Sequence, residues 1–526
     1  MKACKIFIML LLLCKAFIME AQNQNTPKLV VGIVVDQMRY DYIYKFWDNF
    51  SEDGFKKLVN EGFFCRNAIY DYFPTYTGPG HASIYSGTTP SVHGIIGNNW
   101  YDYETRQPVY CAGDWKSQTI CFCKKPHLNE DVNAGKKSPS LLLSTTIGDE
   151  LKLKDSSSKV YAISLKDRSA VLSGGHMADG AFWINSKGKW ITSDHYCSKM
   201  PSWIESFHKN NPIEKYMSGL WNSSNSTIDL NEMLKTYGPS FITSTPKGND
   251  LIVDFSKAIV ENENLGKDSH TDLLSISFSS TDYIGHKYGP DSPEILSTFQ
   301  LLDKNIADLL EFLETKIGKN NLIVFLTSDH GVASVPTKLK SLKIPAGNAD
   351  VMAMKRKLDS LVKEEWGYEE IIWKYSNMQF YLDVEFIDSM NLSLLEIKSS
   401  ILKHIKHFQF VDQAYDFENI SPSQITDEKT QALLRGIYPN RSGEIGFTLK
   451  PGWIERASNT GTGHGTHYRY DTHVPVIFYG KNITPKLLDR PVSISDIAPT
   501  VSLLMHTAFP SGTTGNPIFD LTEKQR

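Results

Sequence analysis

Four short segments of this chain are predominantly apolar, the first of them without interruption and rich in β-branched residues, and together they constrain its fold more than any other feature. They are residues 29–35, 160–165, 273–278 and 322–327. A half-exposed strand alternates apolar and polar residues, whereas an uninterrupted apolar run is typical of a strand buried on both faces of a parallel sheet. A long amphipathic helix is predicted from Ser292 onward, between two of these runs. The pattern therefore predicts an α/β fold with a mostly parallel central sheet sandwiched by helices.

Two regions interrupt this pattern. Residues 174–253 contain a plausible hairpin and an Asn/Ser/Thr-rich loop, and residues 336–450 combine Lys-rich amphipathic helices with short apolar segments. A chain of 526 residues is long enough for one large domain with insertions. We therefore expect a single domain over residues 22–526, with inserted cap or accessory regions at about 174–253 and 336–450.

The N-terminus has the features of a secretory signal peptide. Two lysines precede an apolar run at residues 6–13, and Ala21 offers a small residue for cleavage, so residues 1–21 are the expected signal. This predicts a periplasmic or secreted protein, with lipoprotein anchoring through Cys14 as an alternative. No later stretch is long and apolar enough to predict a membrane span. The five cysteines after the signal are an odd number, which leaves at least one thiol unpaired, and their pairing cannot be deduced.

The overall charge excludes some partners. A net charge of -4 and a pI near 6.4 argue against a general binder of nucleic acid or of membrane surfaces. We expect no nucleic acid as a specific partner.

Residues 73–99 contain a candidate nucleophile, Thr77. Prolines and glycines around it predict irregular structure up to His81, where a helix can begin, and Gly87 can end that helix. Thr77 should then lie on a tight loop just ahead of a helix N-terminus, which favours a bound anion such as phosphate. A threonine hydroxyl is a poor nucleophile unless a base or metal lowers its pKa. An ordinary Gly/Pro turn is the alternative.

Ligand-type side chains follow the predicted buried strands, at or just past their ends. They are Asp36, Asp282 with His286, Asp329 with His330, and His464 in a later loop. The carboxyl ends of parallel strands meet at one edge of a sheet, so these side chains should lie close together, although each alone could simply begin a turn. Three aspartates and three histidines suit two zinc ions. Two metals can hold the attacking and leaving oxygens of an in-line displacement, and one of them would activate Thr77.

Two cations, Lys166 and Arg168, follow the predicted strand at residues 160–165. At a strand's carboxyl end both could reach one phosphate oxyanion. A solvated charged turn is the alternative interpretation.

Taken together, these motifs resemble the alkaline phosphatase superfamily, in its type I phosphodiesterase/nucleotide pyrophosphatase branch, and in particular the exported zinc alkaline phosphatases of the PafA type. The matching segments are residues 35–36, 74–77, 94–99, 166–168, 282–286, 328–331, 463–465 and 470–475. They span nearly the whole chain after the expected signal, in the family's order.

The resemblance implies specific roles for these residues. One zinc ion would be bound by Asp282, His286 and His464. A second would be bound by Asp36, Asp329 and His330, with Thr77 as its nucleophilic ligand. Asn98 would donate its amide to a phosphoryl oxygen, and Lys166 and Arg168 would bind the remaining charge. Two assignments stay open, namely His464 against His467 or His473, and Asn98 against Asn99.

The implied activity is that of an exported zinc-dependent phosphate monoester hydrolase. It would act on small-molecule phosphate monoesters through a phosphothreonine intermediate and release inorganic phosphate. A phosphodiesterase or nucleotide pyrophosphatase is the nearest alternative, although such enzymes usually lack the Lys/Arg pair. A sulfatase is suggested by the Thr77-x-Pro79-x-His81 spacing, but threonine cannot form the aldehyde that sulfatases need. A non-catalytic phosphate- or glycan-binding relative is opposed by the complete ligand set.

Overall fold

The computed structural model of the protein describes residues 26–122, 133–224, 226–420, 425–456 and 460–521. The expected signal peptide at residues 1–21 lies outside these ranges. Within them, no helix combines the length and apolar character that crossing a membrane requires.

Four parallel strands form the centre of the main sheet, and they coincide with the four predicted apolar runs. In sheet order they are β12 (Leu322–Thr327), β1 (Leu29–Val35), β11 (Asp272–Phe278) and β6 (Val160–Ser164). Each pairs in parallel with its neighbour. The predicted fold class, α/β with a mostly parallel central sheet, is therefore confirmed.

Seven further strands widen this centre into the eleven-stranded sheet found in the described part of the chain. Beyond β6 lie β7 (Gly180–Ile184), β8 (Trp190–Ser193) and β5 (Thr119–Ile120), and beyond β12 lie β19 (His473–Gly480), β2 (Phe63–Ile69), β20 (Lys486–Leu488) and β21 (Val492–Ser493). The β19 strand runs antiparallel to both of its neighbours.

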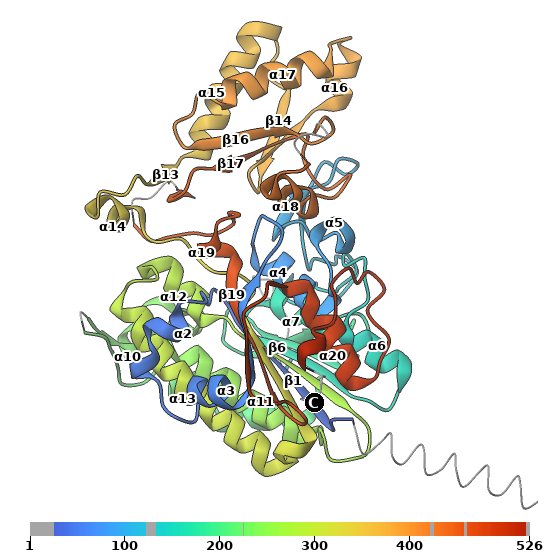
Figure 1. Ribbon diagram of the computed structural model, residues 1–526, viewed down its shortest axis with the longest axis vertical. Helices are drawn as coiled ribbons and strands as arrows, with labels where there is room; N and C mark the ends of the chain where they lie inside the picture. The colour runs from blue at the N-terminus through green and yellow to red at the C-terminus, as the bar shows by residue number, and fades with distance from the viewer. Residues whose placement is uncertain (1–25, 123–132, 225, 421–424, 457–459, 522–526) are drawn as a thin grey trace, which may run out of the picture.

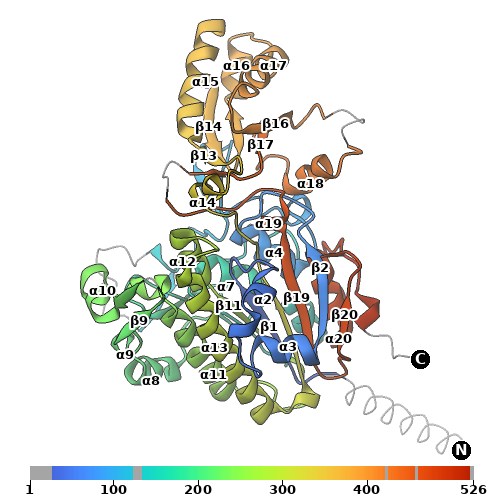
Figure 2. The same ribbon diagram turned by 60° about the vertical axis from the view of Figure 1, so that its left-hand side comes forward.

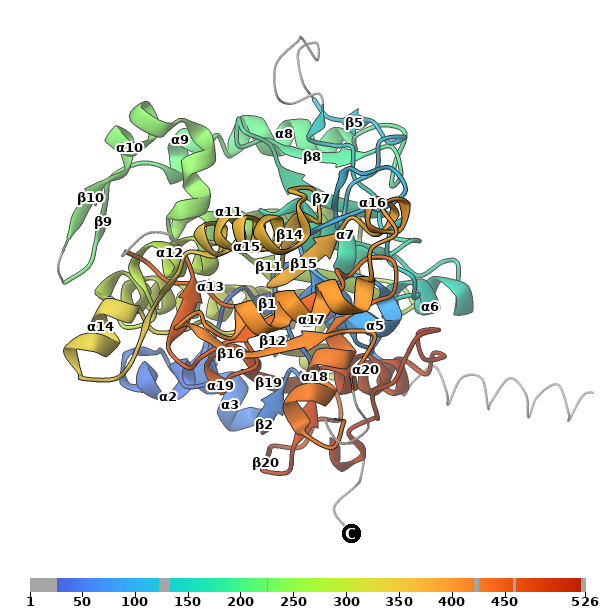
Figure 3. The ribbon, with the colours of Figure 1, turned by 90° about the horizontal axis from the view of Figure 1, so that it is seen from above.

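Helices cover both faces of the sheet (Figure 3). The helices concerned are α11 (Lys247–Asn262) and α13 (Pro293–Ile317) on one face and α4 (Thr77–Ser86) and α20 (Ile497–Met505) on the other. In β1, Val31 and Ile33 belong to the first of these cores, whereas Val30 and Val34 belong to the second. Successive strand residues point to opposite faces, so a strand covered on both sides must be apolar throughout.

Helix α4 starts four residues earlier than the sequence predicts, because Thr77 is its first residue. The first turn of a helix has no intrahelical partner for its N–H groups, so Pro79 costs no hydrogen bond there. Gly80 is required by packing, since an added Cβ would lie 2.3 Å from the backbone oxygen of Asp329. The helix ends as predicted at Gly87, which has φ +70°.

The prediction that residues 174–253 form an insertion outside the main sheet is wrong for its first part. The predicted hairpin exists, but β7 pairs in parallel with β6 and so belongs to the main sheet. The Asn/Ser/Gly turn between β7 and β8 suggested a hairpin, but no local signal indicated that its strands are buried in the main sheet. The later part of the region adds α8 (Ser202–Asn210), α9 (Ile213–Tyr216) and α10 (Leu230–Tyr237), with the small ribbon β9 (Leu220–Asn222) and β10 (Thr227–Asp229).

Residues 336–450 form a separate lobe beyond one end of the main sheet, drawn in yellow to orange at the top of Figure 1 and Figure 2. We call this the accessory lobe. Its four-stranded sheet has the order β14 (Ile372–Ser376), β15 (Gln379–Leu382), β17 (Ile445–Leu449) and β16 (Val411–Asp416). Helices α15 (Val351–Trp366) and α17 (Leu394–Ile405) pack on it around a hydrophobic core of its own.

The close approach of α4 to the end of β12 yields a prediction about stability. Gly80→Ala should lower the free energy of unfolding by about 1–3 kcal/mol, because the new methyl group overpacks against Asp329. Urea unfolding followed by circular dichroism measures the change. Gly463→Ala is the control, since its Cβ would meet no atom within 4 Å. Equal stability of the wild type and Gly80→Ala would contradict the packing argument.

Candidate active site

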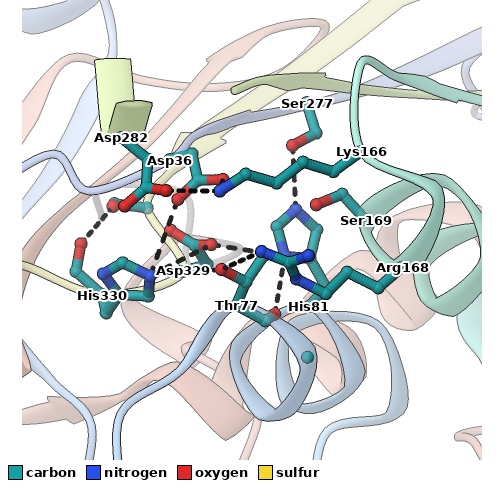
Figure 4. Close-up of polar contacts among 12 residues, drawn as sticks. Asp36, Thr77, His81, Lys166, Arg168, Ser169, Ser277, Asp282, Asp329 and His330 are labelled. Carbon is teal, nitrogen blue, oxygen red and sulfur yellow. Dashed lines mark hydrogen bonds and ion pairs between the residues drawn. The ribbon is translucent and has the colours of Figure 1, made fainter. Parts of the chain in front are cut away.

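The predicted ligand residues meet at the carboxyl edge of the central strands. Asp36 directly follows β1, Asp329 follows β12 by two residues, and Lys166 follows β6 by two. Asp282 lies in α12 (Ser280–Tyr288), which begins two residues after β11. Figure 4 shows their side chains converging on Thr77 at the start of α4. Adjacent parallel strands place their ends side by side, which is why segments hundreds of residues apart come together.

Asp36, Asp329 and His330 form one group of metal-ligand type, and all three are buried. The His330 Nε2 atom lies 3.6 Å from Asp36 Oδ1 and 3.6 Å from Asp329 Oδ2. Neither of these carboxylate oxygens has a hydrogen-bond partner among the described residues. Thr77 Oγ1 lies 3.5 Å from the same His330 nitrogen. A bound cation would satisfy two buried oxygens that the protein itself leaves unpaired.

A second group adjoins the first. Ligand atoms of Asp282, His330 and His464 all lie within 4.8 Å of one another. His286 Nε2 is 3.1 Å from Asp282 Oδ1, and the His330 and His464 rings stack with centroids 3.6 Å apart. The structure therefore brings together all six predicted aspartates and histidines, with His330 between the two groups.

The three histidines share one hydrogen-bond arrangement. The Nδ1 atoms of His286, His330 and His464 lie 2.9, 2.9 and 2.7 Å from the backbone oxygens of Thr462, Gly331 and Thr75. A carbonyl can only accept, so each Nδ1 carries a proton, and Nε2 is the nitrogen that is left to bind a metal ion when the ring is neutral. This is the usual way in which a protein orients histidine as a metal ligand.

The alternative histidines lie elsewhere. His467 packs against the rings of Phe73 and Tyr468, and His473 stacks on Tyr40. Of the three candidates, His464 is the one that the structure places beside Asp282.

The electrostatics of the two groups differ. Burial, reinforced by the charge of Asp329, raises the pKa of Asp36 well above its usual value, and burial raises the pKa of Asp329 to about 7. Burial alone would also raise the pKa of Asp282, but attraction to His286 and Lys166 lowers this pKa well below its usual value. Burial lowers the pKa of His330 to about 3, so its imidazole is neutral. Two repelling carboxylates beside the neutral His330 imidazole fit a divalent metal ion, which stabilises both kinds of side chain in their ligand forms.

Lys166 and Arg168 occupy different positions in the site. The Lys166 Nζ atom bridges the two groups, 2.6 Å from both Asp36 Oδ2 and Asp282 Oδ2. The Arg168 Nη2 atom instead lies 3.5 Å from Thr77 Oγ1. The alternative of a solvated charged turn does not hold for Lys166, which is buried.

Asn98, not Asn99, lies next to Thr77. Its side-chain oxygen accepts a 2.8 Å hydrogen bond from the Gly78 N–H at the N-terminus of α4. The oxygen is thereby fixed, which leaves the amide NH₂ as a donor. Asn99 is exposed and begins β3 (Asn99–Tyr101).

Two residues outside the predicted set also contact the site. Gln37 donates its backbone N–H to Asp329 Oδ1 and its side-chain amide to Asp282 Oδ1, at 3.1 and 2.6 Å. His81 contacts the Thr77 carbonyl through Nδ1 and Ser277 Oγ through Nε2, both at 2.9 Å. The sequence offered one signal for each residue: Gln37 directly follows Asp36, and His81 lies one helical turn after Thr77.

Comparisons with known proteins agree with this geometry. The type I phosphodiesterase / nucleotide pyrophosphatase family matches residues 30–471. Curated relatives include a protein named calcium-transporting ATPase from Myroides odoratus, 35% identical over 96% of this chain and 97% of the relative. Alkaline phosphatase PhoV from Synechococcus elongatus is 37% identical over 95% of this chain and 94% of its own. Alkaline phosphatase PafA from Elizabethkingia meningoseptica is 36% identical, covering 95% and 96%.

A crystal structure of PafA superposes with a TM-score of 0.88 at 34% identity, covering 95% of this chain and 99% of PafA. Because 95% of this chain is covered, the match includes both the main sheet and the accessory lobe. The chain belongs to the type I phosphodiesterase/nucleotide pyrophosphatase family, and within it resembles the PafA-type alkaline phosphatases.

Proposed function

We propose that the protein is an exported, zinc-dependent alkaline phosphatase that hydrolyses small-molecule phosphate monoesters. The observation that carries this proposal is the arrangement around Thr77. Its hydroxyl lies 3.5 Å from both a metal-ligand-type histidine, His330, and a guanidinium, that of Arg168. The similarity to PafA and PhoV over nearly the whole chain supports the substrate class.

Two zinc ions are the proposed cofactors. Asp36, Asp329 and His330 would hold one of them next to Thr77, and Asp282, His286 and His464 would hold the other. Zinc at these positions supplies Lewis acidity, which favours the ionised threonine hydroxyl and offsets charge on the reacting oxygens.

The chain's own residues then bind and orient the phosphoryl group. Thr77 Oγ1 attacks phosphorus in line, the bond to the leaving oxygen breaks, and a phosphothreonine forms that water hydrolyses to inorganic phosphate. The Arg168 guanidinium, adjacent to Thr77, favours both the alkoxide and the anionic phosphoryl group. The amide NH₂ of Asn98 donates to a phosphoryl oxygen, and Lys166 adds positive charge between the Asp36 and Asp282 carboxylates. Positioning and charge stabilisation supply most of the acceleration in such transfers.

Removal of metal should abolish activity. Dialysis against a chelator is expected to remove about two zinc ions per chain and to eliminate monoesterase activity, with recovery when zinc is added back. The physical reason is that the Thr77 hydroxyl would lose the Lewis acid that favours its ionised form. Elemental analysis and a chromogenic phosphate monoester measure the two quantities on one sample. Full activity in metal-free protein would rule out the two-metal mechanism.

Thr77 should carry phosphate during turnover. Thr77→Ala is expected to lower kcat/KM by several orders of magnitude, whereas Thr77→Ser should keep part of the rate because a hydroxyl remains. Acid quenching followed by peptide mass spectrometry locates the phosphate. Thr75→Ala is the control, since that hydroxyl donates to the Thr466 carbonyl and the variant should still be phosphorylated at Thr77. Phosphate on another residue would refute the assignment.

The Lys/Arg pair should set the preference for monoesters over diesters. A monoester has one more charged oxygen than a diester, and a charge-assisted hydrogen bond to it is typically worth about 1.5–3 kcal/mol. Replacing both Lys166 and Arg168 with alanine should therefore lower kcat/KM for monoesters more than for diesters. The extra loss expected for each side chain is about tenfold to a hundredfold.

Two controls accompany this measurement. Zinc content must be determined for each variant, because Lys166 contacts two carboxylates of the metal-ligand groups. Arg168→Ala alone tests the cation that adjoins Thr77 instead. Equal losses on both substrates would make the pair structural and would favour the phosphodiesterase alternative.

A further inference from the structure

The accessory lobe is attached to the loop that carries Asn98. This loop, residues 94–99, connects α5 (Pro90–His93) to β3 and is called the Asn98 loop below. Arg441 of the lobe donates from Nη1 to the backbone oxygens of Gly94 at 2.7 Å and Leu141 at 2.8 Å. Its guanidinium also lies over the Trp100 ring, 5.2 Å from the centroid. A partly buried guanidinium bonded to two carbonyls fixes the start of the loop.

The other end of the Asn98 loop is bound by the lobe as well. Asn377, in the turn between β14 and β15, donates its side-chain amide to the Asn99 backbone oxygen at 2.6 Å. Both Asn377 and Met378 have positive φ, 54° and 59°, so the turn has the backbone form that suits a tight hairpin. The lobe therefore contacts the backbone at both ends of the loop.

Two glycines in the loop leave room for these lobe side chains. A Cβ added to Gly94 would lie 2.6 Å from Arg441 Nη1, and one added to Gly97 would lie 2.4 Å from Asn377 Nδ2. Side chains at these positions would displace the Arg441 guanidinium and the Asn377 amide from where they lie. The loop and the lobe are thus shaped to fit one another.

Apolar contacts reinforce the polar ones. Ile95 and Ile96 of the loop are buried in a hydrophobic cluster that also contains Ala82 of α4 and Tyr381 of the lobe. The next residue but one, Asn98, accepts the Gly78 N–H beside Thr77. A continuous set of contacts therefore runs from the lobe, through the loop, to the nucleophile.

We propose that the accessory lobe is a positioning element of the active site, in which Asn377 and Arg441 hold the Asn98 loop so that the Asn98 amide faces the phosphoryl group. This inference rests on the proposed function and adds a role for the lobe. Asn377 and Arg441 act through Asn98 and do not touch substrate. Preorganised donors contribute to catalysis because they need not be reordered when the transition state forms.

The test removes the Asn377 amide without straining the turn. Asn377→Gly keeps the freedom for positive φ, and Asn377→Asp keeps the side chain's shape while replacing the donor with an acceptor that repels the Asn99 oxygen. We expect both variants to lower kcat/KM for a phosphate monoester about three- to tenfold, the range of one neutral hydrogen bond. In an Asn98→Ala background the same substitution should cost less than about twofold, because its effect passes through Asn98.

Arg106→Ala is the matched control. Arg106 joins the body of the protein to the same lobe through Asp383 and the Trp373 ring, but these contacts do not involve the Asn98 loop. It should leave kcat/KM within about twofold of the wild type. Hydrogen–deuterium exchange of the amides of residues 95–99 gives a readout independent of activity. That exchange should be about three- to tenfold faster in Asn377→Gly and unchanged in Arg106→Ala.

The outcomes separate the two proposals. A wild-type protein without monoesterase activity, or a fully active Asn98→Ala variant, would count against the proposed function, and the exchange measurement would still decide whether the lobe holds the loop. Unchanged exchange in Asn377→Gly, or an equal loss of kcat/KM with and without Asn98, would overturn the positioning role. A loss as large in Arg106→Ala would assign the effect to attachment of the lobe in general, and would overturn it too.

Discussion

The repulsion between buried carboxylates at one sheet edge is the constraint on which the rest of the structure depends. Asp36, Asp282 and Asp329 are held there by three adjacent parallel strands, and burial penalises their ionised forms. The chain offsets part of this cost with Lys166, whose ammonium bridges two of them, and leaves Asp36 Oδ1 and Asp329 Oδ2 facing His330. Buried carboxylates at such an edge are stabilised when a cation binds them, and without a bound cation their burial costs free energy.

Thr77 reaches this edge through close packing of one backbone segment on another. Gly80 allows α4 to approach the end of β12, which sets Thr77 against His330. The Asn98 loop closes the other side, and the accessory lobe contacts that loop at both ends. A region that the sequence presents as an insertion is thus physically continuous with the site, and its contacts are with backbone carbonyls that no residue pattern encodes.

Predictions from the sequence were most accurate where burial of apolar side chains alone determines the local structure. Residues 322–327 form a strand with the predicted bounds because a short, almost entirely apolar segment suits a strand buried on both faces. Prediction failed where tertiary contacts outweighed local preference. Gly78, Pro79 and Gly80 are residues that usually break helices, yet they lie in the first turn of α4, where Pro79 needs no N–H and Gly80 has no Cβ to clash with Asp329. The hairpin at residues 180–193 was assigned to an insertion because its parallel pairing with β6 is a tertiary contact that no local pattern encodes.

By itself, the sequence determined the fold class, the strand ends and the residue types gathered there, because apolar runs and the polar residues after them are local features. It left open which of His464, His467 and His473, and which of Asn98 and Asn99, lies at the site, since neighbours in the chain differ only in the direction they face. Only the tertiary structure decided these points, by pairing His464 with the Thr75 carbonyl and Asn98 with the Gly78 amide. It also decided that Lys166 bridges two carboxylates while Arg168 adjoins Thr77, because the packing of α7 (Asp167–Gly174) against β6 and α4 sets those side-chain directions.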